Sequence, residues 1–347
     1  MTRRFLVAGG LSAAALLGGA AGLARRLGAA ATPEARFFRI GTAATSGTYF
    51  PIGGEIASAI SNPPGSRDCE RGGSCGVPGM IAVAQASQGS VDNVQAVAAG
   101  HIESALCQAD VATWAFNGTG TFDKKRPLNT IRAMANLFPE TVHVVVRADG
   151  PIRSLKDLKG KRVSLGEPES GTLVDARLIL AAVGLTERDL KPANLKISAA
   201  ATALQDGSLD GFFIFGGYPV PAVADLAVTL PIRLLPLAAD TLEKLQRHAP
   251  FFSREAIPAN TYAGLADETS TLSVGALWIA STALDDDLAY ALVKALWQDG
   301  NRRLFEGGHP IGKRIMLAHA LEGVSIPLHP GAARFYADVG MTVATQR

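Results

Sequence analysis

The chain has 347 residues, of which 48% are hydrophobic and 18% are charged, and this length suits two domains of ~150 residues each. The composition excludes a disordered or fibrous protein. A formal net charge of +2 and an aromatic content of 6% give no case for binding of nucleic acid.

The N-terminal segment has the pattern of an export signal. Arg3 and Arg4 precede an uncharged stretch, residues 5–24, which is rich in Leu, Ala and Gly, and small residues follow up to Ala31. A basic start, an apolar stretch and a small-residue cleavage site predict export with removal of residues 1–31. The two arginines also fit a twin-arginine signal, and the apolar stretch is long enough to remain as a membrane anchor instead. Four of the 33 basic and none of the 31 acidic residues lie in this segment, so the remainder has a net charge of −2.

Strand-like and helix-like segments alternate along the rest of the chain. The predicted strands cover residues 37–42, 80–85, 104–108, 131–138, 142–147, 162–165, 193–197, 209–215, 232–237 and 272–280. The predicted helices cover residues 49–62, 90–99, 110–116, 172–183, 198–206, 239–248 and 285–298, with a last helix that runs through Tyr336. This alternation predicts an α/β protein whose parallel sheet is covered by helices, with a second α/β unit over about residues 150–235.

Two of the three cysteines, Cys69 and Cys75, lie in a polar, glycine-rich loop. Because export leads to an oxidising compartment, we expect them to form a local disulfide. Zinc binding is the alternative, although no nearby histidine completes a set of four ligands. Cys107 lies in an apolar run and is expected to be a buried free thiol. The histidines are dispersed, so neither a metal nor a cofactor is expected.

Three turns rich in Gly, Ser and Thr stand where a predicted strand passes into a helix, at residues 45–49, 169–172 and 216–218. In α/β sheets the ligand crevice lies at the carboxyl ends of the strands, where helix N-termini offer free amide N–H groups and a partial positive charge. Two such turns, one from each unit, would hold a small anion between them. The alternative is that each turn only caps its helix.

Motifs for nucleotide binding and hydrolysis do not occur in these turns. Gly166 and Gly171 have the spacing of a P-loop, but Thr172 stands where a P-loop needs lysine. Ser46 and Ser170 lie outside any Gly-x-Ser-x-Gly elbow. The sequence therefore favours a binding protein over an enzyme.

Short segments along the chain match one protein family in order and spacing. They are residues 40–54, 89–94, 108–112, 138–143, 154–160, 168–172, 212–213 and 327–331. Together they resemble the TAXI-type solute receptors of TRAP transporters, over almost all of residues 38–340. The cysteine loop is an addition to the plainest pattern of that family.

The resemblance implies a two-lobed periplasmic binding protein fold, type II-like, with a hinge and an inter-lobe cleft. Lobe 1 would comprise residues 37–147 and 236–347, and lobe 2 residues 148–235. A small organic anion, such as glutamate, glutamine or a related dicarboxylate, would bind in the cleft of a periplasmic monomer. The closed receptor would then deliver it to the membrane subunits of a TRAP permease. The alternatives are an exported enzyme on a similar scaffold, of the kind related to porphobilinogen deaminase, and a periplasmic ligand sensor.

The predicted ligand-binding residues belong to the turns and to neighbouring strand ends: Ser46, Gly47, Thr48, Tyr49, Gln108, Asp110, Glu140, Arg147, Ser170, Gly171, Thr172, Gly217 and Tyr218. Hydroxyl and amide groups of the first and second turns would bind a carboxylate. Arg147 would bind a carboxylate in bidentate fashion, through two guanidinium N–H groups, or form a structural salt bridge. Asp110 or Glu140 would pair with an ammonium group of the ligand, although Asp110 also fits a helix cap.

Overall fold

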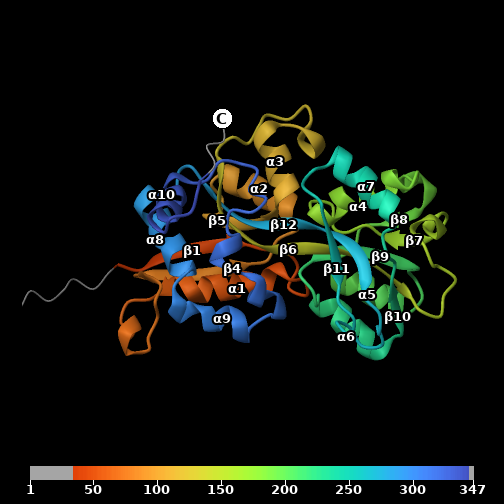
Figure 1. Ribbon diagram of the computed structural model, residues 1–347, viewed down its shortest axis with the longest axis horizontal. Helices are drawn as coiled ribbons and strands as arrows, with labels where there is room; N and C mark the ends of the chain where they lie inside the picture. The colour runs from red at the N-terminus through yellow and green to blue at the C-terminus, as the bar shows by residue number, and fades with distance from the viewer. Residues whose placement is uncertain (1–33, 344–347) are drawn as a thin grey trace, which may run out of the picture.

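The computed structural model describes residues 34–343 (Figure 1). The predicted export signal, residues 1–31, lies outside this part of the chain. Within residues 34–343, no helix has both the length and the apolarity that crossing a bilayer requires.

A mixed sheet of ten strands runs through the molecule and confirms the predicted α/β class. Its main order is β4-β1-β5-β12-β6-β9-β7-β8, with β10 beside β6 and β11 beside β12. The strands are β1 (Arg36–Gly41), β4 (Met80–Gln85), β5 (Ser104–Gln108), β6 (Ile131–Arg147), β7 (Arg162–Ser164), β8 (Lys191–Ala193), β9 (Gly211–Gly216), β10 (Ile232–Leu234), β11 (Ser253–Ile257) and β12 (Thr269–Ser281).

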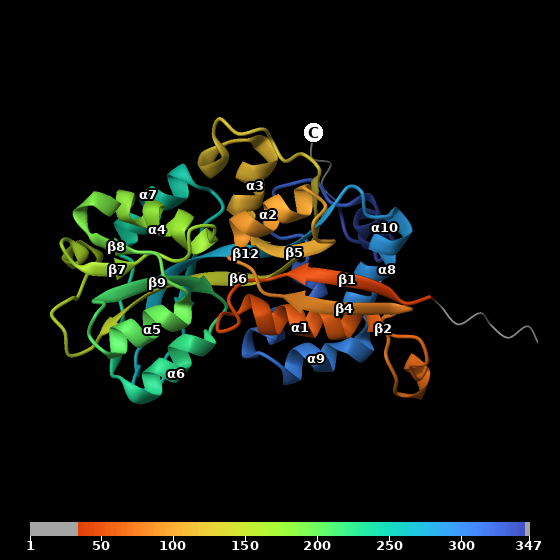
Figure 2. The same ribbon diagram turned by 180° about the vertical axis from the view of Figure 1, so that it is seen from behind.

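Helices cover both faces of the sheet in two halves, which Figures 1 and 2 show from opposite sides. The first half carries α1 (Tyr49–Ile60), α2 (Ser90–Ala98), α3 (Ala109–Asn117), α8 (Asp286–Leu296), α9 (Arg302–Gly307) and α10 (Pro330–Asp338). The second half carries α4 (Gly171–Ala182), α5 (Ile197–Gln205), α6 (Pro221–Thr229) and α7 (Ala239–His248).

Apolar side chains at helical spacing hold the helices against the sheet. On α1, Ile52, Ile56 and Ile60 are fully buried, as the spacing of four residues predicts. On the opposite face, a single apolar cluster joins Val94 of α2 to Leu173 of α4. This shared cluster packs the two halves together along one side of the sheet.

Two long strands connect the halves. β6 has 17 residues and pairs with β12 over residues 131–141 and with β9 over residues 141–146. The sequence predicts two strands here, separated at Pro139 and Glu140, and this is wrong. The backbone stays extended because β12 pairs with β6 at both of these residues.

Four further elements differ from the sequence-based prediction. The strand predicted at residues 193–197 lies earlier, as β8, and α5 already begins at Ile197. Helix α6 and strand β11 were not predicted, because both are short and lack a clear hydrophobic period. The structure places α7 beside α4 of the second half, whereas the sequence assigns all of residues 236–347 to lobe 1. The lobe boundaries themselves stay a prediction.

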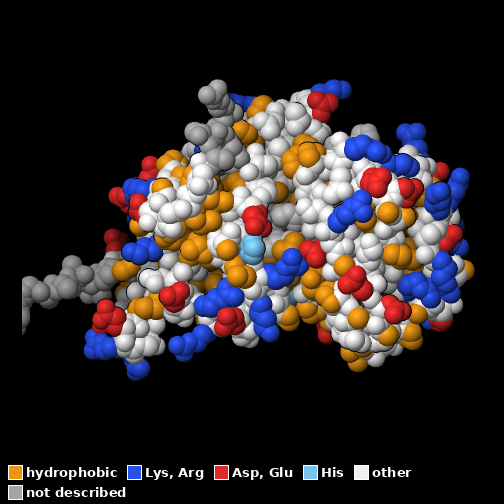
Figure 3. Space-filling view, viewed as in Figure 1, with side chains coloured by type: hydrophobic (Ala, Val, Ile, Leu, Met, Phe, Trp, Pro, Cys, Tyr) orange, Lys and Arg blue, Asp and Glu red, His pale blue; other side chains and the backbone are white. Residues whose placement is uncertain are grey.

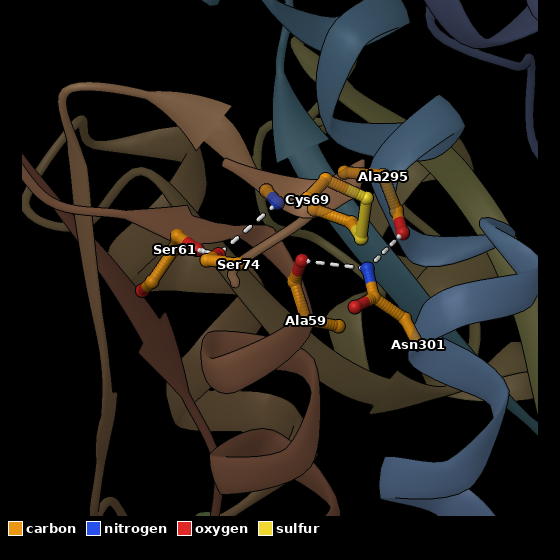
Figure 4. The surroundings of a disulfide bond; sticks show 8 residues. Ala59, Ser61, Cys69, Ser74, Ala295 and Asn301 are labelled. Carbon is orange, nitrogen blue, oxygen red and sulfur yellow. Dashed lines mark hydrogen bonds between the residues drawn. A yellow bond between two sulfur atoms is a disulfide. The ribbon is translucent and has the colours of Figure 1, made fainter. Parts of the chain in front are cut away.

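The predicted disulfide between Cys69 and Cys75 is present. It closes the loop that follows β2 (Ser61–Asn62) and lies near Asn301, as Figure 4 shows. The Asn301 amide group donates to the Ala59 carbonyl at 2.9 Å, at the end of α1. Cys107 is free and buried, as predicted. Within the described residues, no three His, Cys, Asp or Glu side chains form a group that could hold a metal ion.

Charged side chains of both signs are interspersed over the face seen in Figure 3. They lie mainly at the periphery of that face, with apolar and uncharged surface between them. Such a mixed distribution differs from the basic stripe that binding of nucleic acid needs.

Candidate ligand-binding site

A crevice lies between the two halves, at the carboxyl ends of strands from both. Residues 43, 44, 47–49, 88–90, 108 and 140 line it from the first half, and residues 164, 166, 167, 170–172, 195, 197, 200 and 213–215 contribute from the second. The cavity has a volume of about 60 Å³, which corresponds to roughly two water molecules at ~30 Å³ each. The two halves are therefore closed over the crevice.

The turn before α4 presents a helix N-terminus to the crevice. Ser170 is the N-cap residue, and its Oγ accepts a hydrogen bond from the Leu173 amide at 3.1 Å. Gly171 and Thr172 occupy the first helical positions, where backbone N–H groups have no partner within a helix. The Thr172 Oγ1 accepts from the Phe215 amide at 3.2 Å and so ties α4 to the end of β9. This side of the crevice offers N–H donors and a partial positive charge.

The turn before α1 has a different role, because it bonds to the opposite half. The buried Thr48 hydroxyl donates to the Gly217 carbonyl at 2.8 Å. The Ser46 carbonyl accepts from the Ala222 amide at 3.1 Å. Neither residue caps α1 through its side chain. The first turn therefore joins the halves through the Thr48 hydroxyl and the Ser46 carbonyl.

A third contact closes the crevice at the N-terminus of α2. The amides of Val91 and Asp92 donate to the Glu169 carbonyl at 3.1 and 3.2 Å. The Gln95 side chain donates to the Glu169 carboxylate at 2.9 Å. A carbonyl of the second half therefore occupies the donors at the start of a helix in the first half.

Acidic groups are buried on the first-half side of the crevice. Glu140 of β6 is 3% exposed and accepts a hydrogen bond from the Tyr49 hydroxyl. Burial raises the pKa of Glu140 to about 8. Burial also raises the pKa of the Cys107 thiol, and the Glu140 charge raises it further.

Most of the predicted site residues meet at this crevice. The residues that line it are Gly47, Thr48, Tyr49, Gln108, Glu140, Ser170, Gly171 and Thr172. The predicted residues that lie outside the lining are Ser46, Asp110, Arg147, Gly217 and Tyr218.

Among the residues outside the lining, Arg147 forms the structural salt bridge that was its alternative role. Its guanidinium contacts the Asp149 carboxylate at 2.9 Å, and both side chains reach the surface. The Tyr218 hydroxyl accepts from Arg314 at 3.1 Å. Gly217 packs against Ile311, so closely that an added Cβ would lie 2.5 Å from that side chain.

Sequence reasoning missed Ser90 and Asp175. Gly89 and Ser90 open α2 just after β4, so they form a fourth strand-to-helix turn of the same composition. The Ser90 Oγ accepts from the Gln108 amide at 3.1 Å. Asp175 lies inside α4, where nothing in the sequence separates it from a solvent-facing acid, yet its Oδ2 accepts from the Gln108 side chain at 3.0 Å.

Two α/β halves, two long connecting strands and a crevice at the strand ends form the predicted two-lobed, type II-like arrangement of periplasmic binding proteins. Residues 40–340 match the model of the NMT1-like family, and the chain belongs to this family.

Several solved structures are similar to this chain at low identity. The alkanesulfonate-binding protein SsuA of Xanthomonas axonopodis pv. citri, bound to MOPS, is 16% identical with a TM-score of 0.47, over 88% of this chain and 84% of that one. The periplasmic aliphatic sulphonate binding protein SsuA of Escherichia coli is 14% identical with a TM-score of 0.45, over 88% and 83%. PhnD1 of Prochlorococcus marinus, in complex with methylphosphonate, is 10% identical with a TM-score of 0.48, over 78% and 89%.

Proposed function

We propose that the protein is a periplasmic solute receptor of the TAXI type, which captures a small carboxylate and delivers it to the membrane subunits of a TRAP permease. The observation that carries the proposal is that turns from both halves, residues 47–49 and 170–172, line one crevice. A solute held there touches both halves at once, so its binding favours the closed state over the open one.

The ligand carboxylate would bind at the N-terminus of α4. The amides of Gly171 and Thr172 are at the first helical positions, and the positive end of the helix dipole lies there. Burial of a carboxylate requires several donors, and these amides supply them together with the Thr172 hydroxyl. The Ser170 hydroxyl already donates to the Glu167 carbonyl at 2.7 Å.

The charge of the lining favours a ligand that also carries an ammonium group. Among the described residues, the lining of the crevice contains Glu140 and Glu167 but no Lys, Arg or His. A ligand that has a carboxylate but no amine would therefore lie against these two acidic side chains, with no cationic side chain in the lining. An ammonium group next to Glu140 would stabilise the ionised form of that carboxylate. We therefore favour glutamine or glutamate over a dicarboxylate without an amine.

The two connecting strands would act as the hinge. Thr141 of β6 pairs with Ser273 of β12 on one side and with Gly216 of β9 on the other, so it stands where the two halves meet. Opening there would separate the two turns and admit the solute, because the closed cavity has room for little more than water.

The exported-enzyme alternative needs a reactive cysteine at the crevice. Cys69 and Cys75 form a disulfide, and the Cys107 thiol is buried with a raised pKa, which lowers its reactivity. These observations favour binding over catalysis. Transport and sensing share the same binding step, and a TRAP permease encoded beside this protein would favour transport.

A thermal-shift screen of amino acids and dicarboxylates tests the proposal on the processed chain, residues 32–347. At a concentration of ~100 times Kd, a true ligand adds about 2.7 kcal/mol to the free energy of unfolding, which raises Tm by several degrees. We expect glutamine or glutamate to produce this shift, and succinate to produce less. If no small carboxylate raises Tm, the carboxylate assignment is wrong.

A further inference from the structure

Two carboxyl groups from opposite halves meet behind the crevice. Asp110 lies on α3 of the first half and Asp175 on α4 of the second, and both are 0% exposed. Their side chains are in hydrogen-bonding contact with each other. Both oxygens of Asp110 and the Oδ1 of Asp175 lack a hydrogen-bond donor of good geometry, although the backbone N–H groups of Val111 and Asp110 interact with the Asp110 carboxyl. The Gln108 amide group donates only to the Asp175 Oδ2.

Two ionised carboxylates do not remain in such a place. Burial in an apolar surrounding strongly disfavours a carboxylate charge, and a second charge in contact adds repulsion. One proton shared between the two groups replaces that repulsion with a charge-assisted hydrogen bond. It also gives a partner to one oxygen of each group.

The groups around the pair favour the proton as well. Burial raises the pKa of Asp110 and of Asp175, and the Asp110 and Glu140 charges raise that of Asp175 further. Glu140 faces the pair from β6 and the Cys107 thiol from β5, while the Tyr49 hydroxyl of α1 bonds to Glu140. None of these side chains carries a positive charge. The backbone N–H groups of Val111 and Asp110, in the first turn of α3, lower the pKa of Asp110, but burial has the larger effect and the pKa stays raised.

We propose that Asp110 and Asp175 form a proton-binding site that exists only when the two halves are closed, so that each closing event takes up one proton. In the open state the two carboxyls separate and are hydrated, and each titrates near the ordinary value for aspartate of about 3.9. Between that value and the raised pKa of the closed pair, the closed state holds one proton more than the open state. Over this pH range, the equilibrium constant for closing therefore falls about tenfold for each unit of increase in pH.

Infrared spectroscopy of the ligand-free processed chain tests the site without any assumption about the ligand. We expect a carbonyl band of a protonated carboxylic acid at neutral pH that is lost in Asp175→Asn and in Asp110→Asn. Glu140→Gln identifies the separate band that Glu140 contributes, since its pKa is also raised. Asp225→Asn, at an exposed position on α6, is the matched control and should leave both bands unchanged.

Small-angle X-ray scattering between about pH 5 and pH 9 tests the link to closure. The radius of gyration of the wild type should rise with pH, while that of Asp175→Asn should stay at the compact value, because a neutral amide needs no proton. The proposal is overturned if the Asp175→Asn and wild-type proteins have the same bands and the same pH response. It is also overturned if the band appears only after Na⁺ or Ca²⁺ is removed, because a metal ion then occupies the site. A failed thermal-shift screen would reject the ligand but leave these two measurements interpretable.

Discussion

The turns before α1 and α4 have similar sequences, yet the structure uses them differently. Ser170 caps α4 with its side chain, whereas Ser46 forms no side-chain cap on α1. Thr172 holds its own half together through the Phe215 amide, whereas Thr48 reaches the Gly217 carbonyl of the other half. One turn therefore builds the helix N-terminus at which we propose that the anion binds, and the other fastens the halves to each other. Similar composition at a strand-to-helix junction indicates a site, but it does not assign the task of each hydroxyl.

The glycines of the two turns should show the largest contrast. A Cβ on Gly171 would lie 1.4 Å from the Gln108 Oε1, whereas a Cβ on Gly47 would meet only the Ala44 carbonyl at 3.3 Å. Gly171→Ala should hold the halves apart and lower the affinity for glutamine or glutamate by on the order of 10–100-fold. Gly47→Ala should change the affinity little. Titration calorimetry measures the affinity of both variants. An equal loss of affinity in Gly171→Ala and Gly47→Ala would contradict the predicted difference between the two turns.

Glu140 should give the next largest effect, through pH. Its folded pKa of about 8 lies above its unfolded value, so the folded state keeps a proton that unfolding releases. The free energy of unfolding should therefore fall as the pH rises from about 4.5 to about 8, by at most ~1.4 kcal/mol per pH unit. Glu140→Gln stays neutral and should therefore have a smaller slope than the wild type in urea unfolding, and the proton on Asp110 and Asp175 accounts for the slope that remains. Glu268→Gln, at an exposed position, is the control, and a slope in Glu140→Gln equal to that of the wild type would refute the assignment.

Thr48 should matter for stability more than its neighbour in the same turn. Thr48→Val keeps the shape of the side chain but leaves the buried Gly217 carbonyl without its donor. The free energy of unfolding should fall by about 1–3 kcal/mol. Thr45→Val, at an exposed position, should have little effect. Denaturant unfolding measures the free energy of unfolding of both variants. Similar losses would mean that the hydrogen bond from Thr48 to the Gly217 carbonyl does not stabilise the protein.

The smallest contrast concerns the two serines. Ser170→Ala removes the N-cap bond to the Leu173 amide and should lower the free energy of unfolding by about 1 kcal/mol. Ser46→Ala removes no cap and should stay within about 0.5 kcal/mol of the wild type. Thermal unfolding of both variants makes the comparison. A loss at Ser46 as large as that at Ser170 would show that the two turns are used alike.

Local patterns in the sequence determined the elements and several of their details. The buried stripe of α1, the cap at Ser170 and the disulfide of Cys69 and Cys75 each depend on residues close together in the chain. Such features follow from helical spacing, from capping chemistry and from the oxidising compartment that an export signal implies. The strand-to-helix turns were predictable for the same reason, because a strand end and a helix start are read from adjacent residues.

Only the tertiary structure decided which distant residues meet. β6 stays continuous through Pro139 because β12 pairs with it there, and a proline in isolation predicts a break. Asp175 is buried because closure of the halves brings it to Gln108 and Asp110, whereas the sequence of α4 alone would allow it to face water. Arg147 forms a local ion pair with Asp149, two residues along the chain, and only the tertiary structure shows that it lies outside the lining of the crevice. Contacts between the halves depend on how two sheet segments twist and close, and no short stretch of sequence encodes that geometry.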